Sequence, residues 1–119
     1  MKQTIKNIAV IGAGTMGRSI AYASRLAGYA TKLYDVEDKI LNAAIENIQS
    51  SFRKAVEKGI LSPALINQAL AHLETTTDLN IAASEADFII EAVPEKIDLK
   101  IDLFRRLDAI APKHAIFCD

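Results

Sequence analysis

The sequence predicts an α/β protein built on a doubly wound parallel sheet, and three observations support this prediction. Short apolar runs rich in β-branched residues alternate with longer segments whose apolar residues recur at helical spacing. A glycine-rich turn at residues 12–17 follows the first apolar run directly and opens a helix. No repeat, low-complexity stretch or linker interrupts the alternation. Because strands joined by helical crossovers pair in parallel and with right-handed connections, we expect a single sheet with helices on both faces.

Five strands are expected, each a short apolar run that is bounded by turn residues. They cover residues 7–11, 30–34, 73–76, 86–93 and 115–118. Helical periodicity marks residues 16–27, 37–58, 63–71 and 97–111. Gly28 and Gly59 are placed to stop two of these helices, and Ser62 followed by Pro63 is typical of a helix start. Asp78 is placed to cap one or two further helical turns before the fourth strand.

The glycines of the first turn have the spacing G-x-G-x-x-G, which is typical of a dinucleotide site when a strand precedes it and a helix follows. Gly12 allows the tight turn, Gly14 lets a pyrophosphate approach the backbone, and Gly17 lets the helix lie close to the strand. The free amides and the dipole of the helix then face the phosphate charge. The predicted phosphate-binding backbone comprises Gly12, Ala13, Gly14, Thr15, Met16 and Gly17.

An acidic residue ends the second predicted strand, where such a site needs one. Asp35 follows Tyr34 and comes eighteen residues after Gly17. A carboxylate at this place accepts hydrogen bonds from the hydroxyls of the adenosine ribose. A 2′-phosphate would meet like charge there, so the sequence favours NAD over NADP as the cofactor.

Composition and charge narrow the remaining possibilities. Half of the 119 residues are hydrophobic, and the net charge of −1 predicts neither a nucleic-acid partner nor an anionic membrane partner. No apolar stretch approaches the ~20 residues of a membrane span, and the first residues lack the pattern of a signal peptide. Cys118 is the one cysteine, so no internal disulfide is possible. We expect a cytoplasmic protein without a metal site.

Two features go beyond a generic dinucleotide-binding unit. About 38 residues separate Asp35 from Leu73, where a plain crossover needs roughly a dozen, so a helical hairpin is expected after the second strand. The fourth strand ends in "EAVPE", residues 91–95, at the edge of the sheet where ligands bind.

These motifs together resemble those of the L-3-hydroxyacyl-CoA dehydrogenase family, which includes the 3-hydroxybutyryl-CoA dehydrogenases. The matching stretches are "VIGAGTMGRSIA", "LYD", "SSFRKAVEKG", "ADFIIEAVPE" and "AIFCD", in that order along nearly the whole chain. The resemblance implies a Rossmann-type sheet, NAD as cofactor, and the reversible oxidation of a 3-hydroxyacyl-CoA to a 3-oxoacyl-CoA in fatty acid metabolism.

The resemblance also assigns roles to individual residues. It implies that the backbone of residues 12–17 holds the pyrophosphate and that Asp35 holds the adenosine ribose. Glu95 and Lys100 match family residues on the NAD site. Val36 stands where some relatives carry a polar residue, so a second hydrogen bond on the adenosine side is not implied.

Two residues of the long second helix match positions at which the family contacts coenzyme A. They are Ser51 and Lys58. With Arg53 and Lys54 they fit a solvated helix face equally well, so both interpretations remain open at this point.

No residue of the sequence is a good candidate for the catalytic base. His72 and His114 precede the third and fifth strands, so both should lie at the amino edge of the sheet, roughly 15 Å from the cofactor. Cys118 is expected to be a small core residue. By resemblance, the catalytic histidine and a helical domain that completes the substrate pocket and a homodimer follow after Asp119. We therefore expect residues 1–119 to be the NAD-binding domain of a larger enzyme, inactive alone.

Two other functions remain compatible with the glycine turn. A stand-alone NAD-sensing regulatory module has a similar length and needs no catalytic base. A dehydrogenase of the 3-hydroxyisobutyrate type shares the first turn. The insertion between Asp35 and Leu73 disagrees with both alternatives, and the "EAVPE" strand end also disagrees with the first.

Overall fold

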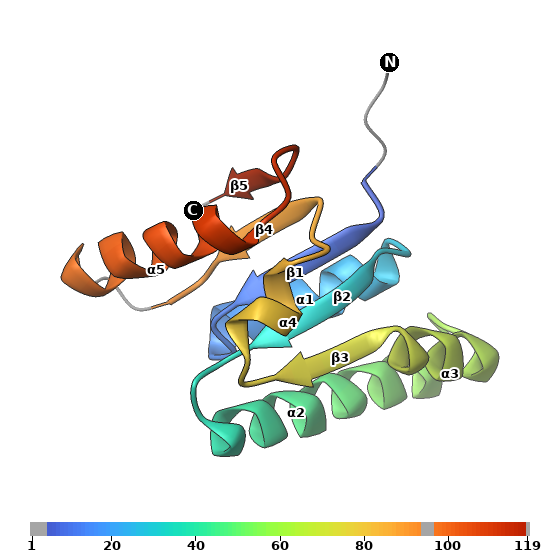
Figure 1. The fold of residues 1–119 in the computed structure, drawn as a ribbon. Helices are drawn as coiled ribbons and strands as arrows, with labels where there is room; N and C mark the ends of the chain where they lie inside the picture. Colours follow the sequence, from blue (N-terminus) through green and yellow to red (C-terminus); the bar gives the residue numbers. More distant parts are fainter. Residues whose placement is uncertain (1–4, 94–96, 119) are drawn as a thin grey trace.

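The computed structural model describes residues 5–93 and 97–118, and it has the predicted alternation of strands and helices (Figure 1). The elements in chain order are β1 (Asn7–Ile11), α1 (Thr15–Leu26), β2 (Ala30–Tyr34), α2 (Asp38–Glu57), α3 (Pro63–Ala71), β3 (Leu73–Thr76), α4 (Leu79–Ala83), β4 (Phe88–Glu91), α5 (Ile97–Ile110) and β5 (Ile116–Cys118). The predicted fold class, a Rossmann-type doubly wound sheet with a helical hairpin after the second strand, is confirmed.

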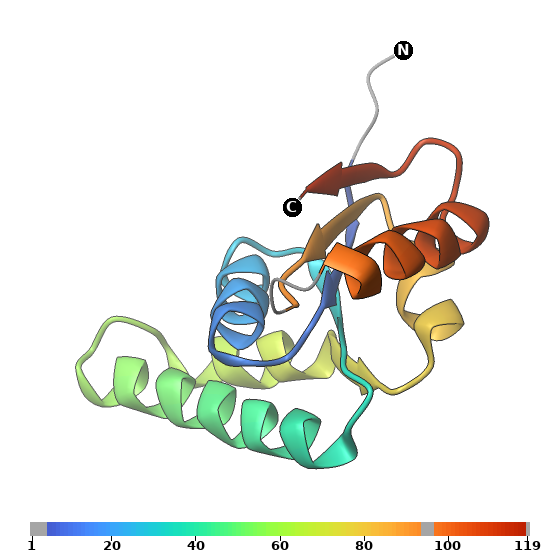
Figure 2. The ribbon, with the colours of Figure 1, turned by 90° about the vertical axis from the view of Figure 1, so that its left-hand side faces the viewer.

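The five strands form one parallel sheet in the order β3-β2-β1-β4-β5. The chain moves outward from β1 in one direction and then returns to the other side, so the order reverses between β1 and β4. Helices α1, α2 and α3 cover one face of the sheet, and α4 and α5 cover the other (Figures 1 and 2). Ligands of open α/β sheets bind at the carboxyl ends of the strands at such a reversal.

Strands β1, β2 and β3 have the predicted bounds, whereas β4 and β5 are shorter than predicted. Strand β4 begins at Phe88 because Ala86 still belongs to the turn after α4, where its amide donates to the carbonyl of Ala83. It ends at Glu91 because its partner strand β1 turns away at Gly12, whose φ is +109°. Strand β5 starts at Ile116 because the amide of Ala115 donates to Pro112 in a turn.

The amphipathic pattern of α2 contributes to the core on the face of the sheet that α1, α2 and α3 cover. Leu41, Ala44, Ile48 and Phe52 recur at helical spacing and are buried against β1, β2 and α1. The ring of Phe52 packs on that of Tyr22, with centroids 4.7 Å apart. This packing holds the first half of the hairpin against the sheet.

A buried arginine on α1 binds α3, the second half of the hairpin. Arg25 lies in the last turn of α1, and its side chain donates to the carbonyls of Tyr29, Gln68 and Ala69, with 2.8 Å to Ala69. Two of these carbonyls end α3, where a cation is favoured by the helix dipole. Burial lowers the pKa of the Arg25 guanidinium from its ordinary value. Helical periodicity alone does not predict this connection.

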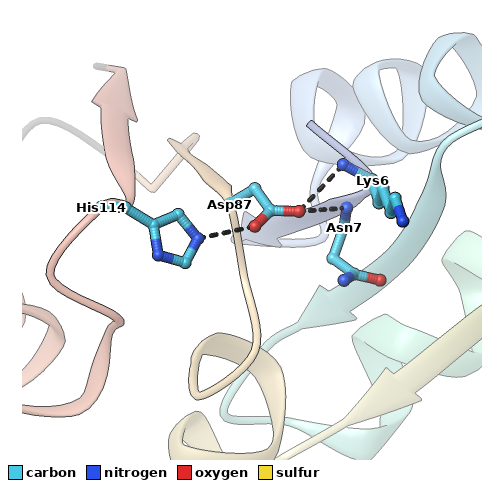
Figure 3. A network of polar contacts seen from close by, with 4 residues as sticks. All are labelled: Lys6, Asn7, Asp87 and His114. Carbon is cyan, nitrogen blue, oxygen red and sulfur yellow. Dashed lines mark hydrogen bonds and ion pairs between the residues drawn. The ribbon is translucent and has the colours of Figure 1, made fainter. Parts of the chain in front are cut away.

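An aspartate joins three strands at the amino edge of the sheet (Figure 3). Oδ2 of Asp87 accepts hydrogen bonds from the backbone amides of Lys6 and Asn7, each at 2.9 Å. Oδ1 of Asp87 lies 2.7 Å from Nε2 of His114. The backbone of Asp87 also donates to Asn7 and accepts from Ile116. This arrangement, which we call the Asp87 clasp, ties together the beginnings of β1, β4 and β5.

Candidate functional site

The glycine turn connects β1 to α1 at the carboxyl edge of the sheet. Gly12 has a φ of +109°, a conformation that side chains rarely adopt. A Cβ on Gly12 would lie 2.8 Å from the carbonyl oxygen of Ala92, the residue just after β4. The amide of Gly12 donates to Tyr34 at 2.8 Å. The turn is therefore packed tightly between the ends of β2 and β4.

The other two glycines have different requirements. A Cβ on Gly17 would lie 1.6 Å from the carbonyl oxygen of Gly12, so only glycine lets α1 approach the turn this closely. Gly14 has an ordinary φ of −70°, and a Cβ there would meet nothing within 4 Å. Neither conformation nor packing therefore requires glycine at position 14. The space above Gly14 fits the approach of a ligand to the backbone.

The first turn of α1 presents backbone amides to the same space. Gly14 is the N-cap residue and has no side chain with which to cap the helix. Thr15 and Met16 begin the helix and are exposed, and no acidic residue lies in this first turn. The first amides of a helix have no intrahelical acceptor and carry the positive end of its dipole. This arrangement suits an anion such as a pyrophosphate.

Asp35 lies beside the turn, as the sequence predicted. One of its carboxylate oxygens accepts from the amide of Ala13 at 3.0 Å, and the other accepts from the amide of Glu37 at 3.2 Å. These bonds fix a half-buried carboxylate next to the glycine turn. Val36, the next residue, is 72% exposed. The residues present thus fit both the pyrophosphate and the adenosine ribose of a dinucleotide.

A buried ion pair lies at the end of the neighbouring strand β4. Oε2 of Glu91 is 3.4 Å from Nζ of Lys100 on α5, and Oε1 of Glu91 accepts from the amide of Val93 at 3.2 Å. Glu91 is paired in register with Ile11, the residue before the glycine turn. Lys100 therefore lies at the predicted edge of the sheet. Glu95, the other predicted residue of this region, is outside the residues that the structure describes.

The sequence matches a known family over nearly its whole length. Residues 7–119 match the family described as "3-hydroxyacyl-CoA dehydrogenase, NAD binding domain". The chain belongs to this family. Pig mitochondrial hydroxyacyl-coenzyme A dehydrogenase is 31% identical over 98% of the chain, and a probable 3-hydroxybutyryl-CoA dehydrogenase of Bacillus subtilis is 32% identical over 94%.

Solved structures of family members have the same fold. The crystal structure of 3-hydroxybutyryl-CoA dehydrogenase from Escherichia coli K12 superposes with a TM-score of 0.91, with 32% sequence identity over 97% of this chain. That match covers 24% of the E. coli chain, and the two relatives above are covered to 38% and 39% of their lengths. The chain therefore spans about two fifths of the length of those two curated relatives.

The structure does not bring the two predicted coenzyme A residues to the glycine turn. Helix α2 begins next to the carboxyl edge and runs toward the opposite edge for about 30 Å (Figure 1). Ser51 is half-buried in its second half, and Lys58 is its exposed C-cap residue. Their contact with coenzyme A remains a prediction.

Both histidines lie at the amino edge, where the sequence placed them. His72 ends α3 immediately before β3, and its carbonyl accepts from the amide of Thr31. His114 belongs to the Asp87 clasp. The prediction for Cys118 was wrong, because its side chain is exposed rather than in the core. Strand β5 lies at the edge of the sheet. The pattern of apolar residues along a strand does not show whether both of its faces are covered by other elements.

Within residues 5–93 and 97–118, no helix is long and apolar enough to cross a membrane. The same residues include no group of three or more His, Cys, Asp or Glu side chains arranged to hold a metal ion.

A cavity of about 380 Å³ opens at the amino edge, opposite the glycine turn. Its lining includes Lys32, His72, Glu74 and Glu85. Sequence reasoning missed this cavity, and it also missed that Glu91 is buried. The one signal for Glu91 was an acidic residue at the end of an otherwise apolar strand.

Proposed function

We propose that residues 1–119 form one NAD-binding domain that serves a dehydrogenase, which reversibly oxidises a 3-hydroxyacyl-CoA to a 3-oxoacyl-CoA in fatty acid metabolism. The observation that carries this proposal is the hydrogen bond from the amide of Ala13 to Asp35. It fixes a carboxylate beside a glycine turn whose helix amides have no side-chain cap. Membership of the family described above supports the same function.

Two groups of this chain hold the cofactor. The amides of residues 14–17 bind the pyrophosphate, and the missing side chain of Gly14 leaves room for it. Asp35 accepts hydrogen bonds from the hydroxyls of the adenosine ribose. A 2′-phosphate at that ribose would be repelled by Asp35, so NADH is preferred to NADPH. Bound NAD supplies the hydride acceptor of the reaction.

The proton acceptor of the reaction is not one of the two histidines of this chain. His72 and His114 lie at the edge of the sheet opposite the glycine turn. Hydride transfer needs nicotinamide, substrate and base within a few ångströms of one another. We therefore propose that the base belongs to the remainder of a complete enzyme, a cytoplasmic homodimer, and that residues 1–119 alone turn over no acyl-CoA.

Coenzyme A recognition is assigned to the outer part of the hairpin. Lys58 is exposed at the end of α2, beside the exposed side chains of Arg53 and Lys54. These three cations outnumber the exposed Glu57 beside them, so the surface suits the phosphates of coenzyme A. Ser51 lies two turns before Lys58 on the same helix. The acyl chain would then extend from the hairpin toward the carboxyl edge of the sheet.

Calorimetric titration of the chain with NADH tests the proposal. Asp35→Asn keeps an oxygen that can accept from Ala13 but replaces the other acceptor with a donor. We expect it to weaken NADH binding by about 1–3 kcal/mol, because the ribose hydroxyls lose their acceptor. Asp102→Asn, an exposed aspartate on α5, is the matched control and should bind like the wild type. Equal affinity in the Asp35→Asn variant, or no binding to the wild type, would contradict the proposal.

A further inference from the structure

Glu91 is a buried carboxylate whose place in the sheet is not explained by packing. Its side chain is 2% exposed, and that of its partner Lys100 is 13% exposed. Ile89, two residues earlier on the same face of β4, is packed in an apolar cluster with Leu107. Alternation along the strand therefore predicts another apolar residue at position 91.

Stability alone is a poor reason for such a pair. Removing two charges from water has a large cost, and exchanging a buried ion pair for packed apolar residues is often neutral or stabilising. The pair lies at the carboxyl edge of the sheet, next to the glycine turn: Glu91 pairs with Ile11, and Ala92 donates to the carbonyl of Ile11 at 2.8 Å. A polar group buried at this edge is better explained by the ligand site.

The strand order says which half of the cofactor passes this pair. β1 lies between β2 and β4, and the glycine turn at the end of β1 receives the pyrophosphate. Asp35, at the end of β2, receives the adenosine ribose on one side of the turn. The nicotinamide half must then extend to the other side, over the end of β4.

Both carboxylate oxygens of Glu91 make contacts at the carboxyl edge of the sheet. Oε1 accepts from the amide of Val93, just after β4, and Oε2 contacts the ammonium of Lys100, in the first turn of α5. The carboxylate thus links the residue just after β4 to the first turn of α5. It also holds the Lys100 ammonium at the carboxyl edge.

We propose that Glu91 is a positioning residue for the nicotinamide half of the cofactor, acting through Lys100. This inference rests on the proposed NAD-binding function. It predicts that loss of the Glu91 charge weakens binding of the nicotinamide half and leaves binding of the adenosine half unchanged.

Comparing NADH with ADP separates the two halves, because ADP carries the adenosine and pyrophosphate but no nicotinamide. In Glu91→Gln, the amide oxygen can still accept from Val93, while the charge that holds Lys100 is gone. We expect this variant to bind NADH about tenfold more weakly than the wild type and to bind ADP within twofold of it. Glu74→Gln, an exposed glutamate on β3, is the matched control and should change neither affinity.

Variants of the partner lysine test whether the two residues act as a unit. Lys100→Met should reproduce the selective loss of NADH affinity, and Lys100→Arg should restore most of it. The double variant Glu91→Gln/Lys100→Met should bind NADH no more weakly than the weaker single variant, since both single changes break the same ion pair. Circular dichroism and the melting temperature identify any variant that fails to fold. If Glu91→Gln does not fold, Lys100→Met and Lys100→Arg decide the question.

A merely structural role gives a different result. If Glu91→Gln and Lys100→Met lower both affinities equally, or lower neither, the positioning role is contradicted while the cofactor assignment stands. If the wild type binds neither ADP nor NADH, the proposed function itself fails.

Discussion

Replacing Asp87 by alanine should lower the stability of the domain more than most substitutions this close to the surface do. The carboxylate accepts from the amides of Lys6 and Asn7 and contacts the ring of His114, with distances of 2.7–2.9 Å. Its side chain is 13% exposed. Alanine removes all three interactions and leaves two amides of the first strand without that acceptor.

The size of the effect follows from the number and kind of these bonds. A hydrogen bond to a charged group contributes about 1.5–3 kcal/mol, and bonds at a partly exposed edge fall at or below the lower end. We therefore expect Asp87→Ala to lower the free energy of unfolding by about 2–3 kcal/mol. For a domain of this length, that corresponds to a fall in melting temperature of roughly 8–12 °C.

The same clasp makes this difference depend on pH. The pKa of Asp87 lies below its ordinary value, chiefly because the amide of Lys6 donates to the carboxylate, with further contributions from His114 and Asn7 and with burial opposing them. A carboxyl group with a lowered folded-state pKa stabilises the fold fully above its unfolded pKa of about 4. This stabilisation is lost as the pH falls through the folded pKa.

Thermal unfolding of the wild type, Asp87→Ala and the exposed-site control Asp102→Ala, measured between about pH 6 and pH 2.5, tests both statements. The wild type should melt well above Asp87→Ala at pH 6, and the gap should close toward the acid end. His114→Ala should lose about 0.5–1.5 kcal/mol, as one of the three interactions. A gap between wild type and Asp87→Ala that stays the same at every pH would refute the argument from the charged carboxylate.

Substitutions at two glycines and one arginine should separate binding from folding. Gly14→Val should abolish NADH binding in calorimetry while the melting temperature stays within a few degrees, because a Cβ there meets nothing within 4 Å; normal NADH binding would refute the role of this turn. Gly17→Ala should instead prevent stable folding, seen as a loss of cooperative unfolding, because its Cβ would lie 1.6 Å from the oxygen of Gly12. Arg25→Met should cost about 2–4 kcal/mol and expose the α2–α3 hairpin to early hydrogen exchange, since three carbonyls lose their donor; unchanged exchange in α3 would show that packing alone holds the hairpin.

Local patterns in the sequence predicted most of the fold because the fold is built from local repeats of strand, turn and helix. The bounds of β1, β2 and β3 follow from apolar runs with clear turn residues on both sides. Strands β4 and β5 were predicted too long. Both start later than predicted because the residues before them belong to turns. Strand β4 also ends earlier, because its neighbour β1, which is distant in sequence, turns away at Gly12.

The candidate site was predictable where one motif contains its parts. The glycine turn and Asp35 are related by a fixed spacing across one strand-helix-strand unit, and the structure brings them to within a hydrogen bond. The partnerships of Asp87 with His114 and of Glu91 with Lys100 join different elements, and no periodicity encodes them. Cys118 was misplaced because the coverage of an edge strand depends on what lies beyond it.

The most direct test of the central claim is to map where NADH binds on the chain by the shifts of its backbone amide signals in ¹⁵N–¹H spectra. Binding of NAD at the glycine turn predicts that NADH moves the signals of residues 12–17 and Asp35, saturably, and that NADPH at the same concentration moves them far less. Signals at the amino edge, such as those of Thr31 and His72 beside the opposite cavity, should stay in place. Shifts confined to that amino edge, or equal responses to NADH and NADPH at the glycine turn, would contradict it.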